Sequence, residues 1–281
     1  MFEAEERNLF DELPPDKNRK EPRRQRRQTD GVKSKSASGV QLLDSSRDLE
    51  ADDWKIKTPA QIQMIGPSNC GKSVRVLDFV KYDKDVFDIE FGVIFYCAPR
   101  AHERHEYTEK LAEICKDTKK KLVQADRVPS IDEVLGASGG EPCLLILDDL
   151  FMFEDLSGVT EFSSMHCHHN KVTAIYCVQN CYEQHKGIRM TTLNRNLTGR
   201  MIFFQQNDMR MLQIINSSLY PERKNYLYNC ILAAKREGRN YVYVNTHCFS
   251  TVPRRYNIYT HLFPFEQGTD KSPKFFDLEG H

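Results

Sequence analysis

The chain has 281 residues, in which 40 Lys and Arg balance 40 Asp and Glu, and 40% of the residues are hydrophobic. This length suits one α/β domain with tails, and the hydrophobic fraction excludes a wholly disordered chain. No run approaches the roughly 18–20 apolar residues of a membrane span, and the first thirty residues are acidic and then basic. We therefore expect neither a membrane anchor nor a secretory signal.

The N-terminal segment differs in composition from the remainder. Residues 1–52 show almost no apolar periodicity, which predicts a disordered arm, basic in the part that contains Arg23–Arg27. This basic run fits a nuclear localisation signal or a DNA-binding arm, and it equally fits a solvated tail without a specific partner. Residues 53–265 form the predicted folded domain, and residues 266–281 form a predicted flexible tail.

Strands and helices alternate from about Asp53 onward. The predicted strands, in chain order, are Gln61–Ile65, Gly92–Ala98, Lys121–Gln124, Leu144–Leu147, Val172–Val178, Met201–Phe204 and Tyr241–Asn245. The predicted helices are Ser73–Val80, Arg104–Lys119 and Pro221–Arg236. Strands that are apolar throughout favour a mostly parallel sheet covered on both faces, so we expect a three-layer α/β sandwich.

The nine cysteines form no CxxC pair and no zinc-ribbon spacing. Several of them, such as Cys97, Cys143 and Cys177, lie inside apolar runs, where a thiol packs as a small hydrophobic group. The pattern predicts free thiols in a reducing compartment, the cytosol or the nucleus.

The strongest motif follows the first predicted strand and opens a helix. It reads Gly66-Pro67-Ser68-Asn69-Cys70-Gly71-Lys72-Ser73 and matches G-x-x-x-x-G-K-[ST] at every fixed position. The glycines let the backbone wrap around phosphates, and the helix N-terminus directs free N–H groups at the anion. Lys72 is predicted to reach the β- and γ-phosphates of ATP, and Ser73 to hold Mg²⁺.

Acidic and amide residues at the ends of two later strands complete the predicted site. Asp148 and Asp149 follow the most apolar strand; Asp148 is predicted to coordinate Mg²⁺, and Asp149 to act as general base on the attacking water. Gln179, at the end of Val172–Val178, is predicted to contact the γ-phosphate. Two adjacent carboxylates are typical of motor-type ATPases, and the strand–helix unit at Val93–Lys119 suits the ATPase class with a strand inserted between the loop strand and the acidic strand.

A succession of further residues resembles one protein family. The succession comprises Gly66–Ser73, Leu144–Leu150, His168–Val172, Gln179-Asn180, Arg189–Asn194, Met201–Phe204, Asp208, Leu219–Pro221 and Tyr241–Asn245. It resembles the viral genome-packaging ATPases of the FtsK–HerA superfamily, more closely those of Maverick/Polinton elements and poxvirus-type viruses. The resemblance extends from Thr58 to Phe263 and implies a P-loop NTPase of the ASCE/RecA-like type.

The resemblance also implies activity and partners. It implies ATP-driven translocation of double-stranded DNA into a capsid by a ring of identical subunits, a pentamer or hexamer, with a capsid or portal protein as partner. In such a ring one subunit supplies an arginine to its neighbour's ATP. Arg189 matches the family's arginine and is predicted to be that arginine finger or a γ-phosphate sensor, with Arg195 and Arg200 as rivals. The expected location is the host nucleus, which the basic arm favours, or a cytoplasmic virus assembly site.

Other interpretations remain open at this stage. A cellular DNA translocase or helicase of the same superfamily would add DNA-binding domains, for which the chain has little room. A nucleotide-switched assembly factor would not need Asp149 as a base, and a nucleoside kinase would need an arginine-rich lid. The run His166–His169 is not expected to bind zinc, because adjacent helical residues point in different directions and no partner CxxC is present; a structural or subunit-contact role is predicted instead. Arg100, His102, Arg104 and His105 are candidates for a DNA-facing loop.

Overall fold

The computed structural model describes residues 54–99, 106–149, 171–181, 196–203, 209–247, 257–267 and 273–276, with the single positions 159, 163 and 167. It describes the backbone alone at 42–43, 105, 184–185 and 188–189. All of these residues belong to one compact unit, Ser38–His281. The predicted basic arm at Arg23–Arg27 lies outside the described residues.

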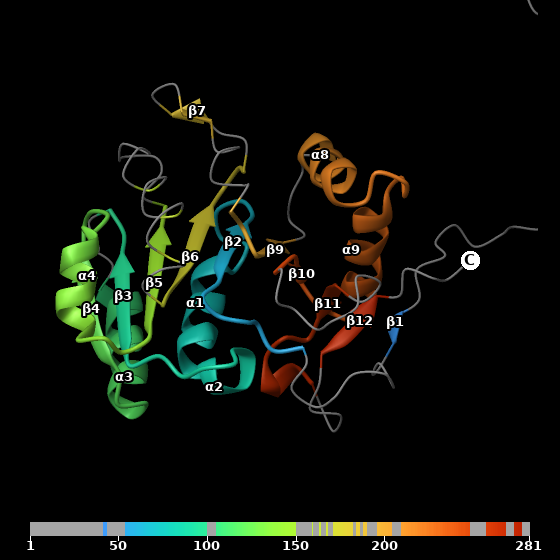
Figure 1. Cartoon of the computed structure of the whole chain (residues 1–281). Coiled ribbons are helices and arrows are strands. Elements are labelled where there is room, and N and C mark those ends of the chain that lie inside the picture. Colours follow the sequence, from blue (N-terminus) through green and yellow to red (C-terminus); the bar gives the residue numbers. More distant parts are fainter. Residues whose placement is uncertain are drawn as a thin grey trace, which may run out of the picture. The chain divides into compact units, whose positions relative to one another are not determined.

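A ten-stranded sheet organises this unit, in the order β1-β12-β11-β10-β9-β2-β6-β5-β3-β4 (Figure 1). The stretch from β9 to β4 is parallel throughout. Its strands are β9 (Gly199–Phe203), β2 (Gln61–Ile65), β6 (Val172–Val178), β5 (Cys143–Asp148), β3 (Val93–Cys97) and β4 (Lys121–Ala125). The mostly parallel sheet is thus confirmed, and β6 is the strand that separates the loop strand β2 from the acidic strand β5.

An antiparallel extension follows beyond β9. It consists of β10 (Tyr241–Asn245), β11 (Ile258–Thr260), β12 (Lys274–Phe276) and β1 (Leu42–Leu43). The strand β12 lies within the residues predicted as a flexible tail, and β1 lies within the residues predicted as an N-terminal arm. In β12, Phe275 and Phe276 are both buried.

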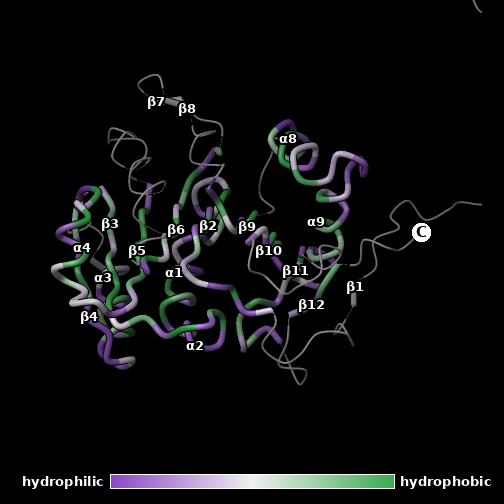
Figure 2. The backbone as a smooth tube through the Cα atoms, in the orientation of Figure 1, coloured by the Kyte–Doolittle hydropathy of each residue, from purple (hydrophilic) through white to green (hydrophobic). Residues whose placement is uncertain are grey.

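Alternate residues of the central strands enter two different cores. Leu144, Ile146 and Cys177 share one core with α1 (Lys72–Lys81) and α3 (His105–Asp117). Leu145 and Tyr176 share the other core with α4 (Ile131–Ser138), α8 (Met209–Leu219) and α9 (Tyr226–Arg236). Figure 2 shows the result as hydrophobic central strands between helices of mixed hydropathy. Strands that are buried on both faces explain why their sequences are apolar without alternation.

The helix predicted over Pro221–Arg236 begins later than expected, at Tyr226. Asn216 of α8 explains the shift, because its side-chain oxygen accepts a hydrogen bond from the Leu227 N–H at 2.9 Å and its amide donates to the Arg223 carbonyl at 2.7 Å. A polar side chain of the preceding helix thus satisfies backbone groups around the start of α9. Residues 221–225 form turns.

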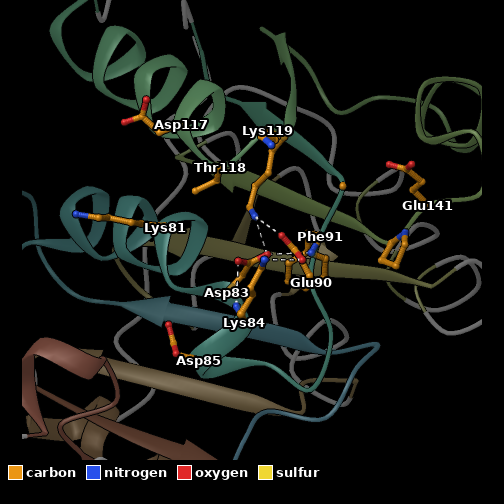
Figure 3. A pocket seen from close by; sticks show the side chains of 13 residues that line it. Lys81, Asp83, Lys84, Asp85, Glu90, Phe91, Asp117, Thr118, Lys119 and Glu141 are labelled. Carbon is orange, nitrogen blue, oxygen red and sulfur yellow. Dashed lines mark hydrogen bonds and ion pairs between the residues drawn. The ribbon is translucent and has the colours of Figure 1, made fainter.

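A charged pocket of about 770 Å³ lies at the amino-terminal edge of the parallel strands (Figure 3). Its centre is a buried ion pair, in which the Lys120 Nζ lies 3.1 Å from an oxygen of Asp83 and both side chains are 2% exposed. Asp83 belongs to α2 (Asp83–Val86) and also accepts a hydrogen bond from the Phe91 N–H. On the pocket's rim, Lys84 and Glu90 form an exposed ion pair.

Among the described residues, no helix has the length and apolarity required to cross a membrane. The described cysteines are free thiols and are all buried. Burial raises the pKa of Cys97 and of Cys143 to about 12, so both thiols stay protonated at neutral pH.

Candidate active site

The carboxyl-terminal ends of β2, β6 and β5 bring the predicted site residues to one edge of the sheet. In the strand register Ile65 lies opposite Val178, and Asp148 lies opposite Cys177. The phosphate loop 66–73, the acidic pair and Gln179 each begin where one of these neighbouring strands ends. Polar groups separated by 30 to 113 residues in sequence are therefore neighbours in space.

The phosphate loop is held by its own lysine. The Lys72 Nζ donates hydrogen bonds to the carbonyl oxygens of Gly66, at 2.7 Å, and Pro67, at 3.0 Å. The Gly66 N–H donates to the Val178 carbonyl at 3.2 Å, which ties the start of the loop to the end of β6. The Lys72 ammonium group thus lies beside the first two residues of the loop, and a cation at this place can neutralise the charge of a bound phosphate group.

Two loop positions accept only glycine. A Cβ atom on Gly66 would lie 2.6 Å from the Cys70 Sγ and 2.9 Å from the Phe203 Cβ, closer than real side chains approach. Gly71 has a φ of +105°, a backbone conformation that residues with a side chain rarely adopt. Gly71 also precedes the first residue of α1, so the loop leads directly into a helix N-terminus.

Asp148 lies on the same side of the sheet as the loop helix α1. It follows the alternation of Leu144 and Ile146, both of which are in the core shared with α1. The Asp148 side chain is buried, and one of its oxygens accepts a hydrogen bond from the Tyr96 hydroxyl at 2.9 Å. A buried carboxylate oriented in this way is suited to hold a metal ion beside the phosphates.

Asp149 adopts a left-handed backbone conformation with a φ of +55°, and its N–H donates to the Cys177 carbonyl at 3.3 Å. This turn ends β5 and leaves the Asp149 side chain only partly buried. The Cys177 thiol lies among these groups. Burial and the neighbouring carboxylate of Asp148 raise its pKa far above the usual range, so that it remains neutral although Lys72 lowers it.

Cys70 in the loop is likewise a protonated thiol. Its pKa is raised mainly by burial, while Lys72 lowers it. A protonated thiol is a poor nucleophile, so this environment favours a packing role for Cys70 in the loop.

Gln179 is exposed directly after β6, one residue beyond the Val178 carbonyl that binds the Gly66 N–H. Gln179 thus follows β6 at the same edge of the sheet from which the phosphate loop begins. Its contact with the γ-phosphate remains a prediction.

The three candidate arginines are placed differently. Arg189 lies in β8 (Ile188–Arg189), which pairs with β7 (Gln184–His185) as a two-stranded sheet of its own, and its side chain lies outside the described part. Arg200 lies inside β9, opposite Gln63, three positions before the end of that strand. Arg195 is outside the described residues. The choice among them remains a prediction.

The histidine-rich run and the candidate DNA-facing loop are mostly outside the described residues. Of the run, Cys167 is described; it is buried in the core, and burial raises its pKa to about 12. No group of three or more His, Cys, Asp or Glu suited to a metal ion occurs in the described part of the chain. Of the candidate loop, the backbone of His105 is described and begins α3.

Two residues of this site were not predicted from the sequence, Tyr96 and Asn240. Tyr96 is the one hydroxyl-bearing residue of β3, and its contact with Asp148 depends on β3 lying next to β5. Asn240 precedes β10, and its side-chain Nδ2 donates to the Cys70 carbonyl at 3.2 Å. Only the order of strands in the sheet could have indicated either contact.

Comparisons with known proteins give structural similarities only. No family model matches the chain, and no curated protein matches it. Among solved structures, the chain is similar to the genome packaging NTPase B204 of Sulfolobus turreted icosahedral virus 2, in complex with ATP-gammaS. The two sequences are 13% identical, the match covers 67% of this chain and 93% of that chain, and the TM-score is 0.42.

Two further structures show weaker similarity. The assembled ATPase EscN of the enteropathogenic E. coli type III secretion system has 15% identity, with 61% of this chain and 49% of that chain covered and a TM-score of 0.35. A KaiC-like protein from Pyrococcus horikoshii OT3 has 15% identity, with coverage of 54% and 75% and a TM-score of 0.37. The P-loop NTPase fold of this chain is identified by two of its own features: the strand order of its parallel sheet, and the phosphate loop that joins β2 to α1.

Proposed function

We propose that the chain is an ATP-hydrolysing motor that packages double-stranded DNA into a capsid. The observation that carries the hydrolase part is the convergence of Lys72, Asp148, Asp149 and Gln179 at one edge of the sheet, with β6 between the loop strand and the acidic strand. A phosphate-binding loop alone serves many activities, whereas a second carboxylate beside the first supplies a base for water.

The proposed reaction is the attack of water on the γ-phosphorus of ATP. The Asp149 carboxylate accepts a proton as the water oxygen forms its bond, and the bridging oxygen leaves with ADP. Lys72 and the backbone N–H groups of the loop stabilise negative charge on the phosphates. Gln179 orients the water or the γ-phosphate, and Arg189 of a neighbouring subunit is the proposed arginine finger.

The donor set fits Mg²⁺. This ion prefers oxygen ligands and is commonly bound by one or two protein groups together with substrate phosphates, so a site without three protein carboxylates is the expected kind. Ser73 and Asp148 would hold the ion, and Tyr96 would orient Asp148. When bound, Mg²⁺ neutralises charge on the β- and γ-phosphates.

The packaging part of the proposal rests on the sequence resemblance described above. It implies double-stranded DNA as the track, a ring of five or six identical subunits, and a capsid or portal protein as partner. The balanced charge of the chain is compatible with this, because a ring requires basic residues only along its pore. The proposed location is the host nucleus or a cytoplasmic assembly site.

Steady-state ATP hydrolysis with and without double-stranded DNA tests the proposal, with wild type, Lys72→Ala and Asp149→Asn compared. We expect turnover that rises with DNA, and a loss of at least about 100-fold in both variants, since a positioned general base contributes on the order of 10²–10⁴. DNA-independent turnover would refute the motor and leave an ATPase. ATP binding without turnover would refute both and favour a nucleotide-dependent assembly factor.

A further inference from the structure

The turn that enters β10 contacts the phosphate loop. Asn240 donates from its side-chain Nδ2 to the Cys70 carbonyl oxygen at 3.2 Å, across 170 residues of sequence. The same nitrogen lies 3.3 Å from the position that a Cβ atom on Gly71 would take. The Asn240 amide thus lies against the peptide unit that joins Cys70 to Gly71, although the residue itself is exposed.

The residues on either side of Asn240 are fixed by a buried carboxylate. Arg239 pairs with Glu266 at 3.4 Å, and the Tyr241 hydroxyl donates to the same carboxylate. Glu266, whose side chain is fully buried, also pairs at 2.9 Å with Arg75, one helical turn after Lys72 on α1. Arg75 lies over the ring of Tyr241, with 5.1 Å to the ring centroid. The turn and the loop helix are therefore held in one network.

The contact sets the direction of one peptide plane. The C=O and N–H groups of a trans peptide point in opposite directions, so a carbonyl of Cys70 that faces Asn240 turns the Gly71 N–H away from it. That N–H makes no hydrogen bond among the described residues. The Cys70 carbonyl is not used by the first turn of α1 either, since the helical bonds there begin with Arg75 N–H to Gly71 O.

We propose that Asn240 is a positioning residue of the nucleotide site, which holds the Cys70–Gly71 peptide so that the Gly71 N–H faces the bound phosphates. This inference rests on the nucleotide binding proposed above and adds a residue from the antiparallel extension to the site. Asn240 acts through the loop backbone and is not assigned a contact with the nucleotide. An asparagine suits the position because it presents a neutral donor without bringing a charge beside the phosphates.

The test is the dissociation constant of Mg·ADP, measured by titration calorimetry on the full chain with wild type, Asn240→Ala and Asn240→Asp. Loss of one hydrogen bond is expected to weaken binding about three- to tenfold in Asn240→Ala. Asn240→Asp keeps the size of the side chain but places a carboxylate against the Cys70 carbonyl oxygen and near the phosphates. At about pH 7.5 we therefore expect Asn240→Asp to lose more affinity for Mg·ADP than Asn240→Ala.

Acidification supplies a signature that a structural defect would lack. The carbonyl oxygen and the phosphates should raise the pKa of the new carboxyl group above its ordinary value of about 4. A protonated carboxyl group donates a hydrogen bond again and has no charge, so the ratio of the Asn240→Asp constant to the wild-type constant is expected to fall between about pH 7.5 and about pH 5. In ATP turnover we expect KM to rise in both variants while kcat changes less, because loop amides bind the ground state and the transition state alike.

Asn229→Asp is the matched control. It makes the same chemical change on α9, which packs on the face of the sheet opposite α1, and it should bind Mg·ADP like wild type. The inference is overturned if Asn240→Asp binds as tightly as wild type while Lys72→Ala does not bind, or if its defect is independent of pH. If wild type itself fails to bind Mg·ADP, the proposed function is refuted and this inference with it.

Discussion

Tyr96 lies on a strand that carries no motif, yet its hydroxyl fixes the orientation of the proposed magnesium ligand Asp148. We expect Tyr96→Phe to lower kcat/KM for ATP hydrolysis by about tenfold or more and to raise the Mg²⁺ concentration needed for half-maximal activity. Groups that orient a metal ligand typically contribute 10- to 100-fold. A magnesium titration of steady-state turnover measures both effects.

Tyr243→Phe is the control for this change. Tyr243 is also fully buried, and its hydroxyl has no hydrogen-bond partner among the described residues, so its removal should leave turnover unchanged and the fold as stable as before. Equal activity of Tyr96→Phe and Tyr243→Phe would show that the Tyr96 hydroxyl has no part in the site.

Site residues can be predicted from the sequence where they are close together along the chain or follow a recognisable strand. The loop residues Gly66 to Ser73 follow one another along the chain, and Asp148 and Asp149 are recognisable because an apolar strand stops there. Tyr96 and Asn240 have no such signal, since each acquires its role from a contact with a residue that lies 52 or 170 positions away in sequence, Asp148 or Cys70.

The short helix α2 and the turn between α3 and β4 are joined by the ion pair of Asp83 and Lys120. We expect Lys120→Met to lower the free energy of unfolding by about 3–5 kcal/mol, because it leaves the buried Asp83 carboxylate without its cation. Urea denaturation followed by circular dichroism measures this change.

Lys84→Met is the matched variant on the rim of the same pocket. Its partner is Glu90, and both side chains are largely exposed, at 65% and 46%. Exposed pairs contribute roughly 0–1 kcal/mol, so this change should have little effect on the unfolding midpoint. Similar midpoints for both lysine variants would contradict the structural role of the buried pair.

Elements were predictable where a long apolar pattern defined them. The strands Val172–Val178 and Tyr241–Asn245 have the predicted bounds. The start of α9 was wrong because Asn216, on another helix, determines which backbone groups are satisfied there. The strand β12 was missed because three residues are too few to show a period, and only its pairing with β11 identifies it.

The complete sheet depends on the chain's last described residues. Phe275 lies in the core that contains α1, and Phe276 lies in the core on the opposite face. We expect Phe275→Ala and Phe276→Ala each to lower the free energy of unfolding by about 3–5 kcal/mol, as for other buried aromatic residues. Thermal or urea unfolding of the purified variants measures the loss.

Lys274→Ala, in the same strand, removes a partly exposed ion pair with Glu237 and should cost less than about 1 kcal/mol. If all three variants unfolded like wild type, residues 274–276 would behave as the tail that the sequence predicts, and their place in the sheet would be wrong.

The contact of Asn240 with the loop has a consequence for the order of synthesis. A ribosome completes residues 66–73 long before it adds the turn at 239–241, Glu266 or β12, so the nascent chain carries a phosphate loop whose supports have not yet been made. The strand β9, which lies directly beside β2, is also added late. We therefore expect the proposed nucleotide site to be complete only after residues 239–276 have been synthesised, when most of the sheet can form around the loop.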